Sequence, residues 1–227
     1  MAGGIIMNMR RQVSLGLLIM LAVTVSAAGQ ERIPVGTFSS IAVRSGCRIV
    51  LRHGPSQQVT LRRGSLEFTS AATEDGTLVI EGHRHGSPRG YRAEVEIVTP
   101  VIEALSVDSG GTIESQPGFP PQQTIDVAVS NGGTIDIRSI AAARVNASVS
   151  QGGRIFTKPG QSLRASVEQG GIITWWGHPV VESSTRHGGV ITEGDEADAS
   201  KPLSDLSPEF ALPPVPPIPP VPPVPPH

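Results

Sequence analysis

Apolar and polar residues alternate along much of this chain, which is the period of β-strands, whose successive side chains point to opposite faces. Five alternating segments share one motif, in which a strand is followed by a polar residue, a Gly-Gly pair and a second strand with Ile near its start. The five segments are residues 107–113, 129–135, 149–155, 167–173 and 185–191. Their Gly-Gly pairs follow one another at spacings of 22, 20, 18 and 18 residues. Such self-similarity is typical of repeat proteins.

The repeats predict an all-β fold built as a parallel β-solenoid. If each repeat is one turn, equivalent residues stack about 4.8 Å apart and share one core. Columns of Val before the glycines and Ile after them would then fill this core, as in Val107 and Ile113. Glycine accepts a positive φ and close backbone contact, which suits a corner and argues against a helix. A β-sandwich of hairpins is the alternative architecture.

The solenoid repeats are expected over residues 101–194, between two less regular segments. Residues 29–100 hold irregular strand candidates with turns at Gly54-Pro55 and Asp75-Gly76, and we interpret them as first coils or a covering cap. Residues 195–227 combine an acidic hinge with a proline-rich tail. In a polyproline II helix the tail would align one apolar stripe for a partner, consisting of Val215, Ile218, Val221 and Val224.

The N-terminal segment predicts export. Arg10 and Arg11 precede an uncharged apolar stretch and the small residues before Gly29, which is typical of a signal peptide over residues 1–28. An uncleaved anchor is the alternative. We therefore expect a periplasmic, outer-surface or secreted protein, whose only membrane contact is through the export signal.

Composition narrows the chemistry. The 227 residues are 38% hydrophobic but only 4% aromatic, so aliphatic side chains must fill the core. A net charge of −2 argues against nucleic-acid binding. Cys47 is the only cysteine, so the chain forms no internal disulfide, and the alternation predicts a buried, unreactive thiol.

The outward columns of the repeats supply the candidate ligand site. One column should form a flat face of short side chains, Ser106, Ala128, Ser148, Ser166 and Ser184. Trp175 belongs to the inner face, so Trp176 is expected outside, near Arg138 and Lys158, where an exposed indole suits sugar stacking. Packing of Trp176 beneath a loop is the alternative.

Catalytic and metal chemistry find little support. Glu114 and Asp136 occupy equivalent outward positions in successive repeats, which gives a polysaccharide-cleaving or calcium-binding pair as an alternative. Arg138 and Lys158 would neutralise that pair. His83 and His85 lack a third ligand, so we expect no metal, no cofactor and no catalytic residue.

The repeats and the strands before them, residues 38–43 and 49–54, resemble the bacterial autotransporter adhesin head-domain family, called the GIN domain, over about residues 33 to 194. That family has no established function, and its usual Ser-Gly-Ser-Gly-like corner is replaced here by Gly-Gly corners. The resemblance implies a right-handed parallel β-helix in an exported protein and supplies no site residues.

The sequence thus favours a noncatalytic, adhesin-like binding module. We expect it to contact a glycan or protein of the cell envelope. A purely structural envelope protein is the third alternative, and the sequence leaves the oligomeric state open.

Overall fold

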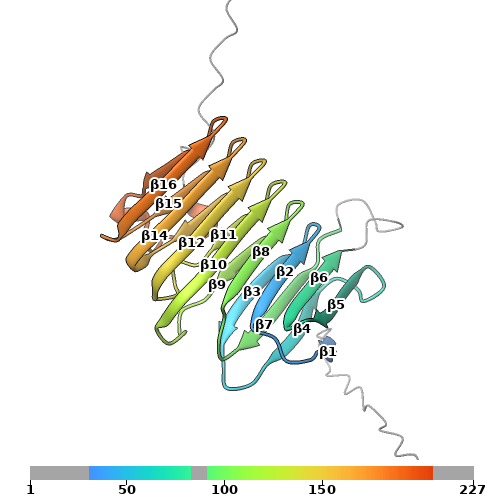
Figure 1. Cartoon of the computed structure of the whole chain (residues 1–227). Helices are drawn as coiled ribbons and strands as arrows, with labels where there is room; N and C mark the ends of the chain where they lie inside the picture. Colours follow the sequence, from blue (N-terminus) through green and yellow to red (C-terminus); the bar gives the residue numbers. More distant parts are fainter. Residues whose placement is uncertain (1–30, 83–90, 207–227) are drawn as a thin grey trace, which may run out of the picture.

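A computed structural model describes residues 31–82 and 91–206. The predicted all-β class is confirmed, because these residues form two β-sheets whose strands follow one another along one common direction (Figure 1). Apart from two short 3-10 turns at Glu196–Asp198 and Leu203–Asp205, the described residues contain no helix. Nothing in this part of the chain forms a helix that could span a membrane.

The strands divide between the two sheets. The eight-stranded sheet holds β2 (Ser40–Arg44), β5 (Thr69–Glu74), β6 (Thr77–Gly82), β8 (Ala104–Asp108), β10 (Gln122–Ser130), β12 (Ala142–Ser150), β14 (Pro159–Glu168) and β16 (Val180–Arg186). The nine-stranded sheet holds β1 (Glu31–Ile33), β3 (Arg48–His53), β4 (Gln58–Arg63), β7 (Glu94–Thr99), β9 (Thr112–Ser115), β11 (Thr134–Asp136), β13 (Arg154–Thr157), β15 (Ile172–Trp175) and β17 (Val190–Glu193).

Each repeat places its first strand in the eight-stranded sheet and its second in the nine-stranded sheet. Equivalent strands of successive repeats pair in parallel, and like residues lie beside like, as Val107, Val129 and Val149 do in one sheet. Parallel pairing excludes antiparallel hairpins for these repeats. Both sheets are mixed, because antiparallel strands lie at one end, and both are open, since each has two edge strands. A closed parallel β-helix therefore stays a prediction.

A sixth unit of the same kind precedes the five repeats. Strands β2 and β3 flank a corner at Ser45-Gly46-Cys47, and Val43 and Ile49 pair with Val107 and Ile113 of the first repeat. This unit lacks the Gly-Gly motif because Cys47 stands where the repeats have their second glycine. Between this unit and the first repeat, the chain forms β4 and β5. Strands β6 and β7 then pair with β2 and β3 on the side away from the repeats.

The two ends of the stack differ. At the N-terminal end the antiparallel strands β1, β4 and β5 lie beyond the repeats. At the other end β16 and β17 are edge strands, and the inward-pointing Ser183 and Thr185 are exposed although their neighbours Ala165 and Val167 are buried. The last repeat therefore has polar side chains at inward positions where the end of the core is exposed to water.

The corners explain the two glycines. The polar residue and the first glycine both adopt left-handed backbone, with φ of 57° at Gln151 and 84° at Gly152. The second glycine serves contact, because a Cβ built at Gly153 would overlap Val129 Cγ1 of the preceding repeat. At the same point the backbones of successive repeats are hydrogen-bonded, since Arg154 N donates to Gly133 O of the preceding corner at 2.9 Å. One corner side chain bonds to the repeat before it, because Asn131 Nδ2 donates to Asp108 Oδ1 at 2.8 Å.

Cys47 takes the second-glycine position in the sixth unit and keeps its backbone role, because Thr112 N donates to Cys47 O at 2.9 Å. The thiol is 2% exposed, and burial raises its pKa to about 11. The prediction of a buried thiol is confirmed. At neutral pH the group stays protonated and behaves as a small hydrophobe.

The two glycines of one corner should respond differently to alanine. Gly152→Ala should cost about 1 kcal/mol, because it adds only left-handed strain where a Cβ meets no atom within 4 Å. Gly153→Ala should cost about 3 kcal/mol, since it adds overpacking against Val129 to the same strain. Urea unfolding followed by circular dichroism measures both. Equal costs would contradict the contact role of the second glycine.

Candidate functional site

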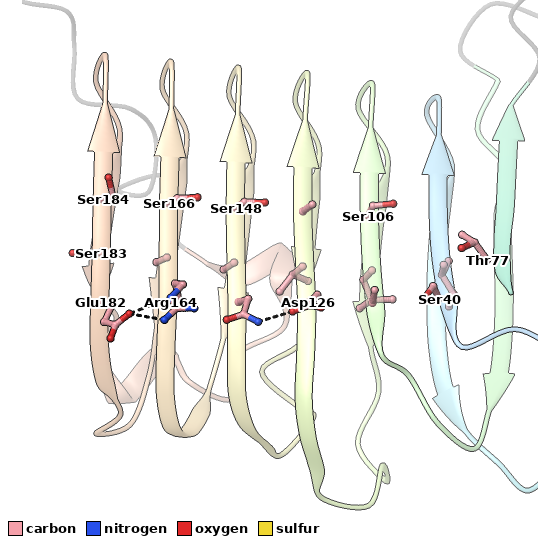
Figure 2. Close-up of a pocket in the computed structure, with 18 residues that line it drawn as sticks. Ser40, Thr77, Ser106, Asp126, Ser148, Arg164, Ser166, Glu182, Ser183 and Ser184 are labelled. Carbon is pink, nitrogen blue, oxygen red and sulfur yellow. Dashed lines mark hydrogen bonds and ion pairs between the residues drawn. The ribbon is translucent and has the colours of Figure 1, made fainter. Parts of the chain in front are cut away.

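The serine column forms the floor of a groove on the outer face of the eight-stranded sheet. Ser106, Ser148, Ser166 and Ser184 follow one another across the sheet, with Ala128 completing the row (Figure 2). The groove has a volume of about 700 Å³ and crosses strands from β6 to β16. Ser148 and Ser184 are exposed and the other two serines are half-buried, so the predicted column exists and reaches solvent.

Larger polar side chains border this floor on one side. Asn146 Nδ2 donates to Asp126 Oδ1 at 2.7 Å, and Arg164 Nη2 meets Glu182 Oε2 at 3.0 Å (Figure 2). Both pairs join neighbouring strands in the row beside the serines. The groove therefore offers hydroxyl, amide, guanidinium and carboxylate groups above a floor of small residues.

On the nine-stranded sheet the prediction of an exposed Trp176 is wrong. The side chain does lie opposite Trp175, but it is fully buried, at 0% exposure. The C-terminal strap, residues 194–206, covers it: Trp176 Nε1 donates to Asp195 O at 2.7 Å, and a Cβ at Gly194 would overlap the indole. The alternative, packing beneath a loop, is what the structure shows.

Arg138 is the second anchor of the C-terminal strap. Its guanidinium forms a two-point ion pair with Asp136, with Nε–Oδ1 and Nη2–Oδ2 distances of 2.9 and 2.6 Å. It also donates to the backbone oxygens of Asp198 and Lys201, at 2.7 and 2.9 Å. The same group lies 5.1 Å from the Trp176 ring centroid, a cation–π distance. With its side chain 6% exposed, Arg138 is not the accessible ligand-binding residue that the sequence predicted.

Lys158 alone of these three predicted residues stays exposed. Its Nζ lies 3.7 Å from Glu196 Oε2, and both side chains are solvent-accessible, so the pair is weak. Within the strap, Lys201 Nζ lies 2.6 Å from Asp198 Oδ1, and that hydrogen bond holds the pKa of Lys201 above its ordinary value. Residues 195–206 thus lie against the nine-stranded sheet, which corrects the interpretation of an acidic hinge for this part of the chain.

Glu114 and Asp136 are neighbours in register, as predicted, but each carboxylate has its own arginine. Arg48 Nη2 lies 2.6 Å from Glu114 Oε2, and Arg138 holds Asp136. Both acids line a hollow of about 440 Å³ beside the strap. The polysaccharide-cleaving or calcium-binding alternative thus concerns two carboxylates that each already form an ion pair.

Several predicted sites lie outside the described residues. These are the His83 and His85 pair and the tail stripe of Val215, Ile218, Val221 and Val224. Within residues 31–82 and 91–206, no three His, Cys, Asp or Glu side chains gather as metal ligands would.

Arg138→Ala should release the C-terminal strap. The change removes both hydrogen bonds to strap carbonyls and leaves Asp136 buried without its ion pair, a loss of about 3 to 5 kcal/mol. We expect cleavage after Glu196 by a glutamyl endopeptidase to accelerate at least tenfold. Arg154→Ala is the control, because Arg154 is an exposed cation of the same sheet that lies outside the hollow beside the strap, and it should change the rate less than twofold. Equal rates in the two variants would contradict the anchoring role of Arg138.

No protein-family model and no curated protein matches the chain. Solved structures do. A "putative adhesin" from Bacteroides fragilis NCTC 9343 matches with 17% identity and a TM-score of 0.50, over 73% of this chain and 96% of that protein. A "putative adhesin" from Parabacteroides merdae ATCC 43184 has 12% identity and a TM-score of 0.35, with coverages of 73% and 95%. A "putative cell adhesion protein" from Clostridium sporogenes ATCC 15579 has 10% identity and a TM-score of 0.36, with coverages of 73% and 99%. At these identities the first match is evidence of a shared fold, and membership of the GIN family stays a prediction.

Proposed function

We propose that this protein is an exported, noncatalytic β-solenoid module that binds an extended glycan or protein along the serine groove. The observation that carries the proposal is the in-register row of small residues, which floors a groove about 700 Å³ in volume across the stack. The row runs at right angles to the strands. A ligand lying in it would meet a similar side chain at each strand.

The geometry suits a polymer better than a compact ligand. Neighbouring strands lie about 4.8 Å apart, so the serine hydroxyls recur at short, regular intervals. Small side chains leave the backbone surface open, and the bordering Asn146 and Arg164 add donors at the edge of the groove. Repeated weak contacts of this kind gain strength along a chain of repeating units.

The names of the structural neighbours agree with an adhesive role. The matched proteins from Bacteroides fragilis and Clostridium sporogenes are described as adhesin and cell adhesion proteins, each with the qualifier "putative". An adhesive module must reach the cell surface, which fits the signal-peptide pattern of residues 1–28. The ion-paired state of Glu114 and Asp136 supports binding without catalysis.

A bulky side chain on the groove floor should weaken binding without disturbing the core. Ser166→Tyr points outward, so we expect a fold of unchanged stability and at least a tenfold loss of apparent affinity for the glycans bound by the wild-type protein. The measurement is binding to an array of extended bacterial polysaccharides. Thr134→Tyr is the control, because Thr134 is a half-buried strand position on the nine-stranded sheet.

Two results would contradict this proposal. Binding by the Ser166→Tyr variant at wild-type strength would place the glycan elsewhere on the molecule. Absence of binding by the wild-type protein to the array and to solubilised envelope proteins would favour a purely structural component.

A further inference from the structure

Acidic and basic residues balance at the N-terminal end of the stack. The described residues from β1 to β7, 31–82 and 91–99, contain seven arginines and seven acidic residues, a formal charge of zero. Residues 100–206 contain seven basic and twelve acidic residues, a formal charge of −5. The N-terminal end is therefore less anionic than the rest of the described chain, and attraction for an anion there depends on where individual arginines gather.

A hollow at this end gathers arginines from three segments. It has a volume of about 580 Å³ and is lined by Arg48 at the start of β3, Arg63 at the end of β4 and Arg92 just before β7. The strands fix these positions, because Glu94 of β7 lies opposite Arg48 of β3 in the register on one side and opposite Arg63 of β4 on the other. Three separate backbone segments thus present guanidinium groups to one space.

The arginines of the hollow are incompletely neutralised. Elsewhere on this sheet Arg52 and Arg62 share Glu96. Arg48 pairs with Glu114 but keeps 56% of its side chain exposed. Arg63 and Arg92 are both exposed and have no ion-pair partner among the described residues.

The surroundings of the hollow do not cancel this charge. Glu94 is the acidic residue in its lining, against three arginines. An anion entering the hollow would therefore meet a net positive potential.

We propose that this hollow binds an anionic sugar unit, carrying a sulfate or carboxylate, of an acidic polysaccharide. Guanidinium groups match the planar oxygens of such groups and form two-point hydrogen bonds with them. One discrete hollow suits single anionic groups projecting from a chain. A nucleic acid, with continuous backbone charge, would need a longer basic surface than a molecule of net negative charge offers. The site lies on the nine-stranded sheet, so it is separate from the serine groove.

The test compares the full chain with an Arg63→Ala/Arg92→Ala double variant, using heparin as the acidic probe and neutral dextran as its uncharged counterpart. Isothermal titration calorimetry at 50 and 200 mM NaCl would measure binding. We expect wild-type binding to heparin that weakens with salt, no binding to dextran, and at least tenfold weaker heparin binding by the double variant. Both side chains are exposed, so the melting temperature should stay unchanged.

Arg154→Ala is the matched control. Arg154 is exposed and occupies the same row of the nine-stranded sheet as Arg48, linked to it through Thr112 and Thr134, but it lies outside the hollow. It should bind heparin within twofold of wild type. An equal loss in Arg154→Ala and the double variant would show diffuse charge attraction and overturn the proposal. Unchanged binding by the double variant, or duplex DNA binding as tightly as heparin, would overturn it too.

Discussion

The close contact between each corner and the valine of the repeat before it is the constraint on which the stack depends. Gly133, Gly153, Gly171 and Gly189 each lie where a Cβ would meet the valine of the preceding repeat. The next residue then donates its N–H to the carbonyl of the preceding corner, as Thr134 N does to Gly111 O at 2.9 Å. Side chains at these positions would push successive repeats apart and break the parallel pairing beyond the corner.

That contact also determines the surface. Residues 144–150 pair in register with residues 124–130 on one side and 162–168 on the other, and the register shift between β12 and β14 lies before them, at the start of β12. Inward columns therefore stay apolar and outward columns stay aligned up to the corner. The serine groove is a direct product of this alignment. The strap and the arginine hollow are not, since each brings residues of irregular segments against the regular sheet.

The features that could be predicted from the sequence are those that follow from its periodicity. Alternation and the Gly-Gly corners were sufficient for the β class, the parallel columns and the outward serines, because strand side chains change face with a period of two. The unit at Cys47 does not follow the repeat pattern in sequence, because one glycine is replaced and the next corner lies 64 residues later. Its Val-to-Ile spacing, from Val43 to Ile49, was the available signal.

The environment of Trp176 could not be predicted in the same way. Periodicity gives its face correctly, but its burial depends on a segment about twenty residues later, whose contacts are backbone carbonyls with no sequence signature. Arg138 likewise resembles an exposed cation in the repeat pattern. Its ion pair with Asp136 and its position over the indole become evident only in three dimensions.

The most direct test of the in-register stack is the distance between Ser106 and Ser184. Spin labels on cysteines at these two positions can be measured by double electron–electron resonance, since Cys47 is buried and remains unlabelled. An in-register stack predicts a narrow distribution near four strand spacings, about 19 Å between backbones. A broad distribution, or a distance well beyond 30 Å, would contradict the aligned column.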